Sequence, residues 1–151
     1  NVPVQVAFKK SNGSIVHRLI CIFSPRFAHC EIVINGTGYP ISGGLARGVN
    51  ARSTNTSYNS NDWRFRDTKW CEEVAIKYVK ANWKVEYDDG GLKAFALPFF
   101  SHDPEKMTCV NDVVRCGIVC GDMRLIGRPS WRITPYKLWR ILRPRKSRVI
   151  R

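Results

Sequence analysis

Alternation of apolar and polar residues predicts β-strands along the first half of the chain. Val2–Phe8 alternates in this way, and the Asn12-Gly13 pair that follows is typical of a tight hairpin turn. We therefore expect the apolar segment Ile15–Phe23 to be the partner strand of that hairpin. Shorter segments over Gly38–Ser42 and Trp63–Trp70 are expected to add further strands.

The segment Ala28–Ile34 is another predicted strand, and it carries polar residues among apolar ones. Because successive side chains of a strand point to opposite faces, His29, Glu31 and Val33 would share one face. Cys30 and the following even-numbered residues would share the other face. An imidazole and a carboxylate would therefore lie side by side on one face of the sheet.

Three segments in the second half of the chain have the features of helices. Trp70–Lys80 begins with acidic residues and ends with basic ones, an order that suits the helix dipole. Thr108 is a suitable N-cap for a helix that we expect to stop at Gly117. A last amphipathic helix is predicted over Tyr136–Leu142, with Pro135 at the favoured first position.

The composition is that of a folded domain with a short basic end. With 44% hydrophobic residues in 151, the chain can bury a core, and its length favours one domain over residues 1–142, followed by a tail over residues 143–151. No apolar run approaches the ~18 residues that a membrane span needs. The first residue is Asn1, with no charged-then-apolar leader after it, so we interpret the chain as a processed or trimmed product.

The net charge of +13 is concentrated at the C-terminus. No acidic residue follows Asp122, whereas ten Lys and Arg residues do. A basic end of this kind is either a solvated surface or an arm that contacts nucleic acid, an acidic protein or a membrane surface. The residues that we expect to bind a polyanion are Arg140, Arg143, Arg145, Lys146, Arg148 and Arg151.

The six cysteines indicate free thiols rather than a disulfide framework or a metal site. They are too sparse for a disulfide-stapled small domain, and no Cys-x-x-Cys occurs. The chain has only three histidines besides, so no metal or other cofactor is predicted. Free thiols persist in a reducing compartment, so we expect a cytoplasmic location, and secretion is not supported.

Cys109 is the cysteine best placed to act as a nucleophile. It comes one residue after the expected N-cap Thr108, where the helix dipole and unpaired backbone amides favour a thiolate. Such a nucleophile works with an imidazole base that a polar group orients. The candidates for that base are His17 in the expected hairpin, His29 at the start of the next strand, and His102 in a loop before Cys109.

A histidine on a strand followed by a cysteine at the head of a helix resembles the circularly permuted papain-like proteins. That group includes permuted NlpC-type peptidases and lecithin:retinol acyltransferase-like proteins. Four segments carry the resemblance by their order and spacing, and together they span roughly residues 25 to 142. They are the His strand, a Tyr-Asp turn, the nucleophile helix and a closing Thr-Pro helix, at His29–Ile34, Tyr87–Leu92, Thr108–Val114 and Ile133–Trp139.

The resemblance implies an α+β fold, in which helices pack on an antiparallel sheet, and hydrolysis or acyl transfer at an amide or ester bond. Cys109 would be the nucleophile and His29 the general base. Glu31 would orient the histidine, with Ser42 as a weaker candidate, and the backbone amide of Cys109 would stabilise an oxyanion. Peptide, peptidoglycan and lipid-ester substrates all fit this chemistry.

An alternative function is that of a papain-like protein that has lost its chemistry. It would be a structural or virion-associated component whose basic C-terminus binds nucleic acid or an acidic protein surface. Permuted papain-like proteins are frequent in large viruses and their particles, so location in a virion fits either function. The distance between the Cys109 sulfur and the His29 ring distinguishes the two, since an active site requires contact.

Overall fold

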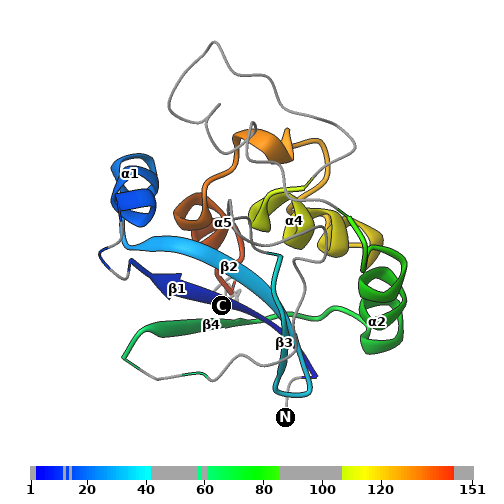
Figure 1. The fold of residues 1–151 in the computed structure, drawn as a ribbon. Coiled ribbons are helices and arrows are strands. Elements are labelled where there is room, and N and C mark those ends of the chain that lie inside the picture. The colour runs from blue at the N-terminus through cyan, green and yellow to red at the C-terminus, as the bar shows by residue number, and fades with distance from the viewer. Residues whose placement is uncertain are drawn as a thin grey trace, which may run out of the picture.

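The computed structural model describes residues 3–11, 13, 15–41, 58, 61–85 and 107–144. Within these residues the chain forms an α+β fold, with a four-stranded antiparallel sheet and helices packed on it (Figure 1). In chain order the elements are β1 (Val4–Lys10), α1 (Ile15–Phe23), β2 (Phe27–Ile34), β3 (Thr37–Tyr39), β4 (Trp63–Asp67), α2 (Glu72–Ala81), α4 (Cys109–Val119), the 3-10 helix η1 (Ser130–Arg132) and α5 (Pro135–Ile141).

The strands lie in the order β3-β2-β1-β4, each antiparallel to its neighbour. The register of β1 and β2 sets Val6 opposite Ile32 and Phe8 opposite Cys30, and all four residues are buried. These four strands confirm the strands predicted over Val2–Phe8 and Ala28–Ile34 and in the two shorter segments. β3 and β4 are shorter than the alternation pattern indicated.

The segment Ile15–Phe23 is a helix, so the hairpin predicted between it and the first strand is wrong. β1 has β2 on one edge and β4 on the other, which leaves it no edge for a further partner. The apolar residues also fit helical spacing, since Ile15, Leu19 and Ile22 recur every three to four positions. His17 consequently lies on α1 and not on the sheet.

Alternation along β2 placed its residues on two faces as predicted, and the two faces have different neighbours. Cys30 and Ile32 face the helices and belong to the main core, which β1, β2, α2, α4 and α5 build together. His29 and Glu31 are on the opposite face, where Trp63 of β4 belongs to a second, smaller apolar cluster. The side chains of neighbouring residues in β2 therefore leave the strand in opposite directions.

β3 covers only the second half of β2. It pairs with Ile32–Ile34, and Pro40 follows its last residue, Tyr39. Proline has no backbone N–H to donate to a ladder, so this pairing does not continue past it. The edge of β2 from Phe27 to Glu31 is left without β3 as a neighbour, and α4 packs against this strand.

α4 begins where the sequence indicated and ends later. Cys109 is its first residue, as predicted from the Thr108 cap, but the helix passes through Gly117 and ends at Val119. Gly121, with a φ of 80°, adopts the left-handed conformation after the end of the helix. The prediction that Gly117 stops the helix is therefore wrong.

α5 is confirmed, with Thr134 as its N-cap and Pro135 as its first residue. The Trp139 ring packs it against the sheet. The centroid of this ring lies 5.2 Å from that of Phe8 and 5.1 Å from that of Phe27. α2 also forms where the charge order predicted it. Among the described residues no helix is long and apolar enough to cross a membrane.

Replacing Gly117 by Ala is expected to destabilise the protein, although Ala favours helices. A Cβ at this position would overlap the Leu125 side chain and the Trp70 ring, which close over the glycine. We expect a loss of about 1–3 kcal/mol in the free energy of unfolding, measured by urea denaturation. Val119→Ala, at an exposed position of the same helix, serves as the control and should change that energy by less than about 0.5 kcal/mol. A Gly117→Ala protein at least as stable as the parent would contradict this account of the glycine.

Candidate active site

The N-terminus of α4 positions the Cys109 thiol. Thr108 has extended backbone angles, and its Oγ1 accepts a hydrogen bond from the backbone N–H of Asn111 at 3.2 Å. Cys109 is thus in the first turn, where backbone N–H groups have no acceptor within the helix and the dipole stabilises a negative charge. The residue is only 6% exposed, so its thiol is largely shielded from bulk water.

Both His29 and Cys30 reach the Cys109 thiol, although they point to opposite faces of β2. Both side chains, and the Cys30 backbone, interact with Cys109 closely enough to lower the pKa of its thiol. Contacts with neighbours on both faces place Cys109 beside the part of β2 that lies beyond its pairing with β3.

Glu31 holds the other side of the His29 ring. Nε2 of His29 lies 3.2 Å from Oε2 of Glu31, as the shared strand face predicted. The Cys109 thiol interacts with the same imidazole ring. Thiol, imidazole and carboxylate thus follow one another in the order of an activated nucleophile.

Tyr58 holds the second carboxylate oxygen of Glu31, because its hydroxyl donates a hydrogen bond to Oε1. Glu31 is 2% exposed, and a carboxylate buried to this degree requires hydrogen-bond partners. Gly38 of β3 makes room for the contact, since a Cβ there would overlap both the Tyr58 hydroxyl and Oε1 of Glu31. The ring of Trp63 stands edge-on to His29, with 6.3 Å between the ring centroids.

The contacts favour a thiolate at Cys109 and an imidazolium at His29. Hydrogen bonds from the Cys30 thiol and the His29 ring hold the pKa of Cys109 well below its usual range, against the opposing effect of burial. Burial by itself lowers the pKa of His29, but its hydrogen bonds to Cys109 and Glu31, and their charges, raise it to about 9. Both shifts favour the form with a proton on the imidazole and a negative charge on the sulfur.

Cys30 has the opposite character from Cys109. Burial raises the pKa of its thiol well above the usual range, and the hydrogen bond to Cys109 acts in the same direction. Cys30 therefore stays protonated and donates its S–H to the Cys109 thiolate. Two neighbouring cysteines thus divide their roles, with one as the anion and the other as a donor that stabilises it.

A second buried carboxylate lies one helical turn beyond the nucleophile. Asp112 is 1% exposed and follows Cys109 by three residues, so both are on the same side of α4. The Tyr78 hydroxyl of α2 donates a hydrogen bond to Oδ1 of Asp112 at 3.1 Å. This bond joins α2 to α4 directly behind the thiol and fixes the helix relative to its neighbour.

The structure brings together the three residues that the sequence proposed for catalysis, Cys109, His29 and Glu31. Of the other candidate bases, His17 lies on α1, and His102 is outside the described residues. Ser42, the weaker orienting candidate, is also outside them. Glu31 is therefore the orienting group that the described part of the chain provides.

The sequence did not indicate two of the site's polar contacts. Alternation placed Cys30 on the strand face opposite His29, and nothing in the alternation showed that the thiol of Cys109 would lie beside both residues. Tyr58 lies in the polar segment 50–62, which has the composition of an exposed loop. The position of Asp112 near Cys109 could have been predicted, because a residue three positions after a helical nucleophile lies on the same side of the helix.

Two of the residues proposed for polyanion binding are at the end of α5. Arg140 is exposed in the last turn of α5, and Arg143 follows that helix. Arg145, Lys146, Arg148 and Arg151 are outside the described residues. Within the described part of the chain, no group of three or more His, Cys, Asp or Glu side chains is arranged to hold a metal ion.

Comparison with known proteins adds no family to this geometry. No protein-family model matches the chain, and neither the curated proteins nor the solved structures include a match.

The Cys109 thiol is expected to be ionised at neutral pH. The difference in ultraviolet thiolate absorbance between the protein and its Cys109→Ala variant should persist as the pH falls from about 9 to about 6, below the usual thiol range. His29→Ala removes a hydrogen-bond donor and a positive charge, so it should raise the pKa of Cys109 and move this absorbance to alkaline pH.

The exposed Cys71 provides the matched control for this titration. Cys71→Ala should leave unchanged the difference in absorbance that is assigned to Cys109. An absorbance that rises only above about pH 8, as for an ordinary thiol, would contradict an ionised Cys109.

Proposed function

We propose that the protein is a cysteine-dependent hydrolase or acyltransferase that acts on an amide or ester bond. The observation that carries this proposal is that Cys109, at the head of α4, interacts with His29, whose ring also contacts the Glu31 carboxylate at 3.2 Å. A helix-capped thiol paired with an oriented imidazole is a known means of making a nucleophile. Metal or cofactor chemistry is not needed for the reaction described next.

In the first step the Cys109 thiolate attacks the carbonyl carbon of the substrate. The carbonyl oxygen becomes an oxyanion, which the backbone N–H of Cys109 at the helix N-terminus can stabilise. The His29 imidazolium gives its proton to the departing amine or alcohol as the bond to the carbonyl carbon breaks. The product is an acyl group in thioester linkage to Cys109, with a neutral imidazole beside it.

In the second step His29 acts as the base. It removes a proton from water, or from an acceptor hydroxyl or amine, and the resulting nucleophile attacks the thioester. The bond to sulfur breaks, the acyl group leaves, and Cys109 and His29 return to the thiolate and imidazolium. Water as acceptor makes the protein a hydrolase, and another acceptor makes it an acyltransferase.

Glu31 supports both steps by holding the imidazole. Its bond to Nε2 fixes the ring orientation, and its negative charge stabilises the protonated ring. Tyr58 fixes Glu31 in turn. The imidazole consequently keeps its orientation beside Cys109 through both steps.

We further propose a permuted papain-like fold for this site. The histidine strand β2 precedes the cysteine helix α4, which is the order of that group, and a Thr-Pro helix, α5, follows both. The antiparallel sheet and the helix-capped cysteine support this proposal. The Tyr-Asp turn at Tyr87–Leu92 lies outside the described residues. A peptide, a peptidoglycan or a lipid ester would be the substrate, and a reducing compartment or a virion the location.

Reaction with an activated ester should place one acyl group on Cys109. With p-nitrophenyl esters of increasing chain length, we expect a burst of p-nitrophenol and an acyl-protein that peptide mass spectrometry assigns to Cys109. Cys109→Ala should abolish the burst, and His29→Ala should slow acylation at neutral pH about 100-fold or more. Glu31→Gln should retain the acylation site but react more slowly.

Cys71→Ser is the control for non-specific reaction of an exposed thiol, and it should behave like the parent. Acylation spread over several cysteines, or a burst that His29→Ala leaves unchanged, would contradict the proposal. That result would favour the alternative function, in which the protein retains these residues but is catalytically inactive.

A further inference from the structure

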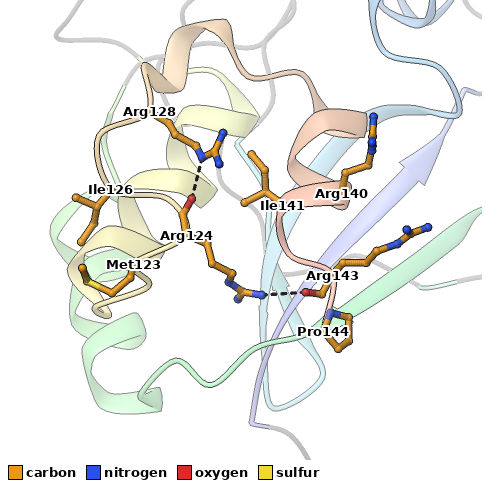
Figure 2. A pocket seen from close by; sticks show the side chains of 8 residues that line it. All are labelled: Met123, Arg124, Ile126, Arg128, Arg140, Ile141, Arg143 and Pro144. Atoms are coloured by element: carbon orange, nitrogen blue, oxygen red, sulfur yellow. Dashed lines mark hydrogen bonds between the residues drawn. The ribbon is translucent and has the colours of Figure 1, made fainter. Parts of the chain in front are cut away.

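A second feature is a basic hollow beside the end of α5, and none of the residues of the thiol site lines it. Its volume is about 480 Å³. Figure 2 shows its two sides, the turn that follows α4 and the end of α5. The side chains that line it are Met123, Arg124, Ile126 and Arg128 from the turn, and Arg140, Ile141, Arg143 and Pro144 from the end of α5.

Two of the four arginines donate hydrogen bonds to backbone carbonyl oxygens, which carry no net charge. Nη1 of Arg124 donates a hydrogen bond to the carbonyl oxygen of Arg143 at 3.4 Å, across the hollow (Figure 2). Nε of Arg128 donates to the carbonyl oxygen of Arg124 at 2.9 Å. These bonds position the guanidinium groups without neutralising them.

A single carboxylate, that of Asp122, pairs with these arginines among the described residues. It lies 2.7 Å from Arg124 and also accepts a hydrogen bond from the Trp70 indole at 2.9 Å. Arg128, Arg140 and Arg143 have no carboxylate partner in the described part of the chain. The hollow therefore has an excess of positive charge.

Arg66 of β4 extends this positive region towards the sheet. Its guanidinium stacks on the Trp139 ring at 3.4 Å, and its Nε donates a hydrogen bond to the Trp139 carbonyl at 3.2 Å. Burial lowers the pKa of Arg66, and the charge of Arg143 lowers it further. The two guanidinium groups thus repel each other, and a nearby anion would reduce that repulsion.

Large apolar side chains project beside the arginines. Met123 is 76% exposed and Ile126 is 47% exposed, and both line the hollow. A nucleic-acid backbone would satisfy the arginines and leave these two side chains in water. An anionic lipid surface satisfies both, because phosphates lie at the level of the arginines and acyl chains directly below.

We propose that this hollow binds the surface of a membrane that contains anionic phospholipids. Arg128, Arg140 and Arg143 contact headgroup phosphates, for which guanidinium groups are suited by their paired donors. Met123 and Ile126 enter the layer beneath the headgroups. The protein lies on the membrane without crossing it, and the inference is independent of any chemistry at Cys109.

The test is sedimentation of the full chain with lipid vesicles. We expect binding to vesicles of phosphatidylcholine with phosphatidylserine, little binding to phosphatidylcholine alone, and weakening as salt is added. Arg140→Gln with Arg143→Gln should reduce the affinity roughly tenfold or more. Met123→Ser with Ile126→Ser should reduce it by about tenfold or more at equal charge. All four positions are exposed, so these variants should fold normally.

Lys77→Gln with Lys80→Gln provides the matched control, because it removes two exposed charges from α2. This variant should bind like the parent, as should Cys109→Ala. Equal loss of binding in the α2 variant would show general charge attraction and overturn the proposal. So would the absence of vesicle binding at low salt.

Binding to a labelled single-stranded oligonucleotide tests the alternative that the hollow binds nucleic acid instead of a membrane surface. If the protein binds it in a manner that requires Arg140 and Arg143, and Met123→Ser with Ile126→Ser leaves vesicle binding unchanged, the hollow serves nucleic acid and the proposal is wrong.

Discussion

The site depends on one contact, the meeting of the α4 N-terminus with the part of β2 that β3 does not pair with. The interactions of Cys109 with His29 and Cys30 require the helix to begin beside this part of the strand. Thr108 contributes by starting the helix one residue before the thiol. The apolar core between β2 and α4 holds the two elements together. The hydrogen bond from Tyr78 to Asp112 also joins α4 to α2.

Local patterns predicted the parts of this arrangement that depend on neighbours in sequence. The Thr108 cap placed Cys109 at a helix start, and alternation placed His29 and Glu31 on one strand face. The contacts of Cys30 and Tyr58 were not predictable, because they depend on where α4 and a distant segment approach β2. The helix α1 was mistaken for a strand because a nine-residue apolar segment fits both periods, and only the occupied edges of β1 decide between them. Gly117 was mistaken for a stop because its role is contact with Trp70 and Leu125.

The same scaffold presents a second surface of different chemistry. α5 is anchored by Trp139 on Phe8 and Phe27, and it carries Arg140 and Arg143 to the rim of the basic hollow. The thiol site is buried and relies on a few short polar contacts, whereas the hollow is open and relies on unneutralised charge beside exposed apolar side chains. A hydrolase or acyltransferase held at a lipid surface would combine the two, and each proposal can fail without the other.

The protonation state of His29 is the most direct test of the central contact. Nitrogen chemical shifts of the imidazole, assigned by comparison with a variant that lacks His29, should show both ring nitrogens protonated up to about pH 9. In Cys109→Ala the pKa of His29 should fall, because a hydrogen-bond partner and a negative charge are removed. A His29 ring that titrates near its ordinary value of 6.5 in both proteins would contradict the account.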